Sequence, residues 1–536
     1  MLINMTIMNV PLFIISKFKK EEMESEKRAF FSKLAGYSIP LTFLILMGWY
    51  NYLMVNSYNY TIFDLGLSLR LMYLLAYHHT IIYTSNNLLY NPLPFGKFIF
   101  VPLSIFLYLY NNILTPLIIQ IVVISAGGYA VFSISRKRNL GLFISLVLEL
   151  AYFLYPSTYG FMEHGGNFQV LLEGFVLLGY MFYIQRKMSV AFVFFLFASL
   201  TNIWAPIIVL AFLLIDFITF HKSIIGKIYS LIRNRTSITL QNIGKYKSYF
   251  VFVILILVVN IAIFTNTVFS AGGFSSLLIS SRISAASGLS YISGSNYGYL
   301  QNISLNFGSE KLPFLYYEFS PILFLPILTP YFFLILIYFL ISWLSPSSVY
   351  YSILQQYPYL FASFIFIGTI HFFSSMHNKN VSKSLLKKLA IIVLISSIIS
   401  FCLFSPFSIS NIQDGTVQSE SHISKFDTDL TYGISLIPSN ASVFIQNDLP
   451  QLMNRAEVYS PGYYNNQTVD YAVIIPFGFS PLSDLYSGYS PYWSKFFKHN
   501  SSYGIYENIS GAIIYKLYYS GTPVYVVPYN QTLFSY

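Results

Sequence analysis

Long apolar stretches alternate with short polar or basic stretches along most of the chain. A helix of about 20 apolar residues is long enough to cross a bilayer. The pattern therefore predicts an α-helical, polytopic membrane protein. We expect an N-terminal segment of residues 1–34, a transmembrane domain of residues 35–406 and a soluble domain of residues 407–536.

The basic residues fix the predicted orientation, because Lys and Arg gather in short runs between apolar stretches, as they do in cytoplasmic loops. Each basic loop is placed on the cytoplasmic side, so an even number of spans must separate any two of them. This rule gives about eleven spans, with the N-terminus in the cytoplasm and the C-terminal domain outside. The loops 56–112 and 268–320 and the hairpin tip Thr201-Asn202 then lie outside, and residues 98–110 form an apolar helix at the outer interface. The predicted spans are 35–55, 113–135, 140–155, 167–185, two within 189–220, 249–267, two broken near Thr329-Pro330, 357–373 and 389–406.

The C-terminal tail alternates strand-like and helix-like runs, which predicts a small α/β domain outside the membrane. The predicted strands are 441–445, 471–475 and 511–518, and the predicted helices are 449–455 and 482–497. The tail is also dense in the pattern Asn-x-Ser/Thr, the acceptor for glycosylation on external loops. These candidate glycosylation sites are Asn440, Asn466, Asn500, Asn508 and Asn530.

Composition agrees with a chain dissolved mainly in lipid. It is 55% hydrophobic and only 9% charged, against roughly 25% charged residues in soluble domains. The formal net charge of +10 is confined to short loops, so we expect no nucleic-acid partner. The single cysteine, Cys402, allows no disulfide and no cysteine metal site within one chain.

The outer face carries few ionisable residues, which makes each of them a candidate for function. Asp64 follows the first span. It acts either as a general base or ligand of a divalent metal ion on the outer face, or as the cap of the helix predicted at 65–77. Glu163 and His164 lie between two spans, where they either ligate a metal and orient a base or are simply solvated.

Four further ionisable residues have two readings each. Arg70 and Arg282 either bind a phosphate through the guanidinium group or extend from the apolar layer toward water. Glu149 and Glu173 fall inside predicted spans, so we expect them to face the bundle interior and to pair with hydroxyls or with each other.

An ordered series of motifs carries a family resemblance from about Asn59 onward. Phe-Asp-Leu-Gly at 63–66 is followed by Tyr-Asn-Asn-Ile-Leu-Thr-Pro at 110–116, leading into a span with Gln120. Ala-Tyr-Phe-Leu-Tyr-Pro at 151–156, Ser-Pro-Ile-Leu-Phe-Leu-Pro at 320–326 and Leu-Ile-Pro-Ser-Asn-Ala-Ser-Val at 436–443 come later. The series resembles a family of archaeal and bacterial predicted membrane proteins of unknown function (domain of unknown function 2079), grouped with the GT-C glycosyltransferases.

The resemblance implies transfer of a sugar from a polyprenyl-phosphate donor in the outer leaflet, with the first-loop acid, here Asp64, as catalytic base. His164 matches the family's histidine in a stretch where the other polar residues differ. Asn202 and Gln356 stand where the family is usually ionisable. They are therefore substrate-binding candidates, alongside Arg70 and Arg282, in a site with altered polarity.

Two other classes of function stay open. A transporter would use charged or broken helices at the midplane, such as those with Glu149, Glu173 and Pro330. A non-catalytic scaffold would use the outer domain to hold a protein partner in the cell envelope. Membrane lipid is a partner in every case. A transferase needs Asp64 and an arginine in one outer cleft that opens toward lipid, a transporter needs a polar path, and a scaffold needs neither.

Overall fold

The structure is a computed structural model. It describes residues 25–60, 65–80, 83–85, 88–90, 97–159, 165–202, 204–220, 247–270, 311–344, 359–413, 422–445, 449–459, 468–475 and 490–528.

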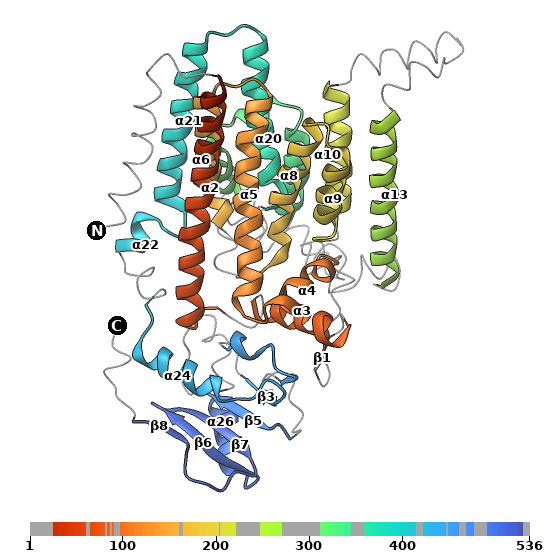
Figure 1. Cartoon of the computed structure of the whole chain (residues 1–536). Coiled ribbons are helices and arrows are strands. Elements are labelled where there is room, and N and C mark those ends of the chain that lie inside the picture. Colours follow the sequence, from red (N-terminus) through yellow and green to blue (C-terminus); the bar gives the residue numbers. More distant parts are fainter. Residues whose placement is uncertain are drawn as a thin grey trace.

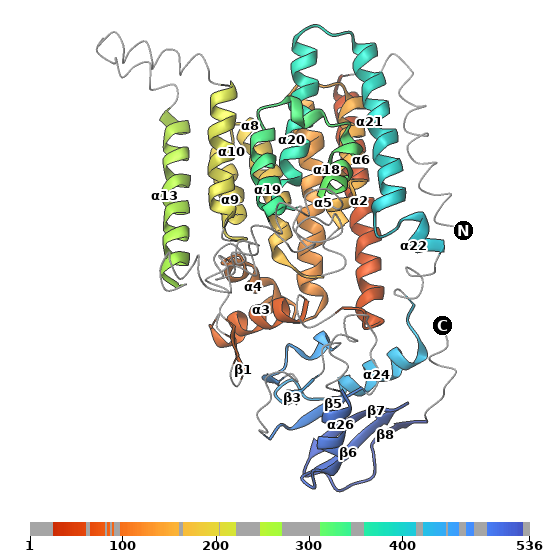
Figure 2. The same ribbon diagram turned by 180° about the vertical axis from the view of Figure 1, so that it is seen from behind.

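A bundle of helices forms the larger part of the molecule, with the C-terminal domain at one end (Figures 1 and 2). Four helices among the described residues are long and apolar enough to cross a membrane. They lie in α2 (Ser25–Asn56), α5 (Leu114–Lys137), α20 (Tyr359–Asn378) and α21 (Lys383–Phe404). The chain is thus confirmed as a mostly helical protein with candidate membrane spans.

Further apolar helices stand beside these four, at the places where the hydrophobic pattern predicts further spans. They are α6 (Leu142–Phe153), α8 (Leu171–Ile184), α9 (Met188–Ser199), α10 (Ala205–Phe220), α13 (Lys247–Ser270) and α19 (Phe332–Leu344). The turns between α5 and α6, α8 and α9, and α20 and α21 all lie at the end opposite the C-terminal domain (Figure 1).

Two helices lie between the bundle and the C-terminal domain, across the direction of the long helices (Figures 1 and 2). They are α3 (Leu67–His78) and α4 (Phe100–Leu109), and a small antiparallel hairpin, β1 (Tyr83–Ser85) with β2 (Leu88–Tyr90), follows α3. Helix α4 coincides with the apolar segment that the sequence places at the outer interface.

Helices α5 and α8 cross at a pair of glycines. A Cβ on Gly174 would lie 2.5 Å from the carbonyl oxygen of Val123, and a Cβ on Gly127 would lie 3.1 Å from the Cα of Gly174. Small residues let two helix backbones approach closely, which is how helices commonly associate in membranes. The crossing fixes α8, and through it the loop that precedes α8 on the domain side.

The chain between α18 (Lys311–Phe319) and α19 runs through two 3-10 turns, η5 (Ser320–Ile322) and η6 (Leu325–Leu328). Breaking a helix frees backbone carbonyls that need partners. The hydroxyls of Ser396 and Ser397 on α21 supply them, donating to the carbonyls of Ser320 at 2.6 Å and Pro321 at 2.8 Å.

The C-terminal domain is built on a six-stranded mixed sheet with the strand order β4-β3-β5-β7-β6-β8. β3 pairs in parallel with β4 and β5, β7 pairs antiparallel with β5 and β6, and β8 pairs in parallel with β6. The strands are β3 (Ser442–Phe444), β4 (Glu457–Tyr459), β5 (Tyr471–Ile474), β6 (Tyr503–Ile509), β7 (Ala512–Leu517) and β8 (Tyr525–Val527).

Apolar residues bury both faces of this sheet. Phe444 and Ile474 join a cluster with Trp493 and Phe497 of α26 (Ser490–His499). Alternate positions, such as Val443 and Val473, join the cluster that contains α24 (Lys425–Ser435). Successive side chains of a strand point to opposite faces, so the domain has three layers, with the sheet between two helices.

The three predicted strands are confirmed as β3, β5 and β7. The helix predicted at 449–455 is wrong, because only the 3-10 turn η8 (Pro450–Leu452) forms there. The carbonyl of Arg455, which a helix would direct along its own axis, instead accepts from Arg70. Of the helix predicted at 482–497, the described part is α26.

Hydrogen bonds attach the C-terminal domain to the bundle. The Tyr58 hydroxyl lies 3.0 Å from the Thr431 hydroxyl, and the Gln451 amide donates to the Val55 carbonyl at 2.8 Å. Asn454 donates to Asn111 at 3.1 Å. These contacts hold the domain against the end of α2 and the residues just before α5.

Candidate functional site

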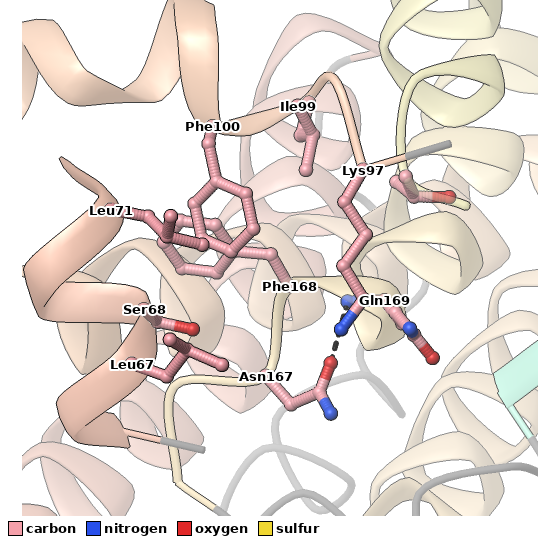
Figure 3. Close-up of a pocket in the computed structure, with 10 residues that line it drawn as sticks. Leu67, Ser68, Leu71, Lys97, Ile99, Phe100, Asn167, Phe168 and Gln169 are labelled. Atoms are coloured by element: carbon pink, nitrogen blue, oxygen red, sulfur yellow. Dashed lines mark hydrogen bonds between the residues drawn. The ribbon is translucent and has the colours of Figure 1, made fainter. Parts of the chain in front are cut away.

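A small hollow lies at the domain-facing end of the bundle (Figure 3). Four separate segments build it: the first turns of α3, the start of α4, the 3-10 turn η4 (Phe168–Val170) and the turn after α9. Its lining is Leu67, Ser68, Leu71, Lys97, Ile99, Phe100, Asn167, Phe168, Gln169 and Thr201. Residues more than a hundred positions apart in the sequence thus meet at one place.

The lining combines an apolar wall with a few polar groups, which is the usual make-up of a binding site. Lys97 is the only charged side chain among the described residues that line it. In Figure 3 the Lys97 side chain runs down toward Asn167 and Gln169, while Phe100 and Phe168 form the apolar side. Their rings lie 5.1 Å apart between centroids. The hollow therefore suits an anionic group next to an apolar one.

A buried glutamine of α5 holds the loop that forms the floor of the hollow. Gln120 is 0% exposed; its Oε1 accepts from the Gly166 amide at 3.0 Å, and its Nε2 donates to the Asn167 carbonyl at 3.4 Å. Gly166 has a φ of +74°, which favours glycine. Asn167 Oδ1 then caps η4 by accepting from the Gln169 amide at 3.0 Å. The loop geometry is thus set by α5.

The same loop packs against the segment that leads into α3. A Cβ on Gly165 would meet the Tyr60 ring at 2.5 Å, and one on Gly166 would lie 3.2 Å from the Cα of Leu65. Leu65 and Gly66 form a π-helical turn before α3, a feature often found at functional sites. Leu65 follows Asp64 in the chain and Gly165 follows His164, so the sequence neighbours of both predicted residues meet here.

Five of the predicted site residues lie outside the described residues: Asp64, Glu163, His164, Arg282 and Gln356. Their roles and the predicted convergence of Asp64, His164 and Arg282 on one cavity therefore stay predictions. The helix predicted at 65–77 is confirmed as α3, and its N-cap residue, Gly66, makes no side-chain capping bond.

Arg70 and Asn202 are described, and both make structural contacts. The buried Arg70 guanidinium donates to the carbonyls of Arg455 and, at 2.9 Å, Ala456, and so attaches α3 to the C-terminal domain. Asn202 Oδ1 accepts from the amides of Trp204 at 2.8 Å and Ala205 at 3.0 Å, capping α10. Asn202 thereby positions its neighbour Thr201 in the hollow.

The two acids expected inside the bundle are buried there. Glu173 is buried near Tyr152 and Thr158, and its Oε1 has no hydrogen-bond partner among the described residues. Neither carboxyl oxygen of Glu149 has a hydrogen-bond partner in the described part of the chain. A third acid, Glu318, accepts from Tyr155 and, at 2.7 Å, from Ser157.

Three of the candidate glycosylation sites belong to described segments of the C-terminal domain. Asn440 is exposed, and Asn500 and Asn508 are half-buried. Asn466 and Asn530 lie outside the described residues. Among the residues that the structure does describe, no group of three or more His, Cys, Asp or Glu side chains could hold a metal ion.

Lys97 is not among the binding residues predicted from the sequence. A signal was present: Lys97 is the only Lys or Arg between Arg70 and Arg136, and it directly precedes an uncharged apolar segment. Ser68, Gln169 and Thr201 carried no such signal, because common polar residues acquire a role only when the fold brings them together.

Comparison with known families agrees with this architecture. Residues 54–510 match the model of a family described as "Predicted membrane protein (DUF2079)". The match begins within α2 and ends after β6, so it includes the hollow and most of the C-terminal domain. A search of the curated proteins finds no match.

Proposed function

The chain belongs to the DUF2079 family of predicted membrane proteins, and from that premise we propose that it is a membrane glycosyltransferase-like protein. It transfers a sugar from a polyprenyl-phosphate donor on the outer face of the membrane. The observation that carries the proposal is the hollow at the domain-facing end, with one cation and an apolar wall, beside the contact of Gly165 with Tyr60 and Gly166 with Leu65.

In the proposed reaction, an acceptor hydroxyl oxygen forms a bond to the anomeric carbon of the sugar. The bond between that carbon and the phosphate oxygen breaks, and polyprenyl phosphate leaves. Asp64 takes the hydroxyl proton, or holds a divalent metal ion that stabilises the leaving phosphate. Glu163 and His164 orient the base and the acceptor. Proton transfer by a positioned group accelerates a reaction by about 10²–10⁴-fold.

Arg282 and Gln356 contact the donor in this proposal, and Asn202 acts by holding Thr201 at the hollow. Arg70 has a different role, because its guanidinium group is occupied by two carbonyls of the C-terminal domain. It attaches that domain to α3, whose first turns line the hollow. This leaves Arg282 as the proposed arginine for the donor phosphate.

We further propose a topology of about eleven spans, with the N-terminus in the cytoplasm and the C-terminal domain outside. The basic turns after α5, after α8 and before α21 lie at the end opposite that domain, as the excess of Lys and Arg in cytoplasmic loops requires. The Asn-x-Ser/Thr sites of the domain are then available for glycosylation, most directly the exposed Asn440.

The test is a transfer assay with the full chain in lipid nanodiscs and labelled polyprenyl-phosphate sugar. The wild-type protein should transfer the label, and Asp64→Asn should reduce turnover by about 10²–10⁴-fold. His164→Gln should also reduce turnover. Asp470→Asn serves as a control, because this exposed acid binds Ser442 within the C-terminal domain. Full activity of Asp64→Asn, or a wild type that transfers nothing, contradicts the proposal.

A further inference from the structure

We propose that Lys97 binds the phosphate of a lipid phosphate and that helix α4 holds the adjoining hydrocarbon chain; the identity of that lipid as a sugar donor rests on the function proposed above. The chemistry required is one phosphate group attached to a long apolar chain. The sequence comparisons assign neither residue nor helix to any ligand.

The hollow provides the polar half of this site. Lys97 is its only charged lining residue, and an ammonium group binds phosphate as a point charge with three donors. The side chains of Ser68 and Gln169 add polar groups to the lining, whereas the Thr201 hydroxyl donates to the Ala198 carbonyl at 2.8 Å. Among the described residues that line the hollow, the one charged group is the Lys97 ammonium, and an anion is the ligand that complements it.

Helix α4 provides the apolar half. Its buried positions, Phe100, Leu103, Ser104 and Leu107, face the rest of the protein, whereas Ile105 is 58% exposed and Leu109 is 74% exposed. Val101, Phe106 and Tyr108 are exposed on the same helix, and residues 98–112 contain no charged side chain. An exposed apolar face of this kind marks a surface for hydrocarbon rather than for water.

The two halves are joined at the first turn of α4. The Ile99 amide donates to the Leu200 carbonyl at 2.8 Å, and the Phe100 ring packs on the Phe168 ring of η4. These contacts fix the start of α4 against the floor of the hollow. Lys97 and Val101, the first exposed apolar residue of α4, are only four positions apart, so a headgroup at Lys97 has its chain beside α4.

The hollow and the exposed face of α4 adjoin each other, and this arrangement favours a lipid phosphate over a free phosphate ion as the ligand. A free ion would contact only the cation and the polar groups of the hollow, and its binding would not depend on the exposed residues of α4. A lipid phosphate uses both, since each buried CH₂ of its chain contributes about 0.8 kcal/mol. The geometry therefore favours a chain-bearing phosphate.

The experiment measures equilibrium binding to the full chain in nanodiscs, with a long-chain and a short-chain polyprenyl phosphate, the polyprenol of the longer length and inorganic phosphate as probes. Wild type should bind polyprenyl phosphate more tightly than the polyprenol. Lys97→Ala should weaken polyprenyl-phosphate binding by roughly 10- to 100-fold, as expected for one charge-assisted contact, and leave polyprenol binding unchanged. Ile105→Ser should reduce the preference for long over short chains.

Two variants separate binding from folding. Lys97→Arg keeps the positive charge and should bind within a few-fold of wild type. Lys498→Ala removes an exposed cation from α26 of the C-terminal domain and should have no effect. Unchanged affinity in Lys97→Ala overturns the assignment of Lys97, and competition by inorganic phosphate as strong as by polyprenyl phosphate overturns the role of α4.

The binding result is independent of catalysis. If the protein binds polyprenyl phosphate through Lys97 but transfers no sugar, the result supports the lipid-phosphate site and contradicts the proposed function. If the protein transfers sugar and Lys97→Ala has an unchanged KM for the donor, the result supports the proposed function and contradicts the lipid-phosphate site.

Discussion

Buried acidic side chains are held in different ways in the two parts of the molecule. In the bundle, Asp216 accepts from the hydroxyls of Tyr180 at 2.9 Å and Tyr331 at 2.8 Å, much as Glu318 accepts from Tyr155 and Ser157. Hydrogen bonds of this kind offset part of the cost of burying a carboxyl group. In the C-terminal domain, Glu507 is 0% exposed, and neither of its oxygens has a hydrogen-bond partner among the described residues.

Burial raises the pKa of Glu507 to about 7, from an ordinary value of 4.5. Between about pH 4.5 and pH 7, the Glu507 carboxyl group is therefore protonated in the folded domain and ionised in the unfolded chain. The free energy of unfolding falls as pH rises through this range and stays low above it. Glu507→Gln removes this loss. The variant should be more stable than wild type above pH 7, and the gain should vanish below pH 4.5.

Hydrogen exchange of α24 and β6 in the full chain, compared between variant and wild type at each pH, measures this gain. Both elements adjoin the carboxyl group, since a Cβ on Gly433 of α24 would lie 2.3 Å from Glu507 Oε2. The exposed Glu457 of β4 provides the control, and Glu457→Gln should leave the pH dependence unchanged. An equal gain for Glu507→Gln at pH 4 and pH 8 would contradict the role of the carboxyl charge.

At the level of elements, the bundle depends on close helix approach as well as on hydrophobicity. Gly174→Ala places a methyl group 2.5 Å from the Val123 carbonyl oxygen, a backbone atom that moves only with α5. Overpacking of this kind costs about 1–3 kcal/mol. The variant should therefore lose its folded fraction at a lower temperature than wild type, as measured by size-exclusion chromatography after heating in detergent.

Gly141→Ala is the matched control, because a Cβ at Gly141 meets nothing within 4 Å. Since Gly141 has a φ of −60°, alanine is compatible with its backbone, and the variant should behave as wild type. If both variants are equally stable, the α5–α8 crossing is looser than described.

Periodicity and charge in the sequence were sufficient to predict helices at α2, α4, α5, α20 and α21, because the length of an apolar run and its basic flanks are local properties. The site was predicted only in part. The contact of Gly165 with Tyr60 depends on how Gln120 holds a loop 46 positions away, and no local pattern encodes such a contact. For the same reason Arg70 was expected at a phosphate, although the structure gives it two carbonyls 385 and 386 positions away.

For the whole molecule, the attachment of the C-terminal domain depends strongly on Arg70. Arg70→Ala removes the donors to the Arg455 and Ala456 carbonyls, and hydrogen bonds to charged groups are worth about 1.5–3 kcal/mol each. Amide hydrogen exchange in residues 449–459 should therefore accelerate by roughly 10-fold or more, while the amides of β6 and β7 stay protected. Arg136→Ala is a control, because Arg136 binds the Leu140 carbonyl at the opposite end of the bundle. Faster exchange throughout the sheet would instead mean that the domain unfolds.

The orientation of the molecule decides whether the hollow can meet a donor in the outer leaflet. The basic turns at the end opposite the C-terminal domain predict that the domain is outside. Two exposed serines at opposite ends, Ser501 in the domain and Ser384 at the start of α21, can each be replaced by cysteine in a Cys402→Ser background. A membrane-impermeant maleimide added to intact cells should label Ser501→Cys at once, and it should label Ser384→Cys only after the membrane is opened. Labelling of Ser384→Cys alone would place the hollow in the cytoplasmic leaflet, where Lys97 would face a different set of lipids and the proposed outer-face transfer could not occur.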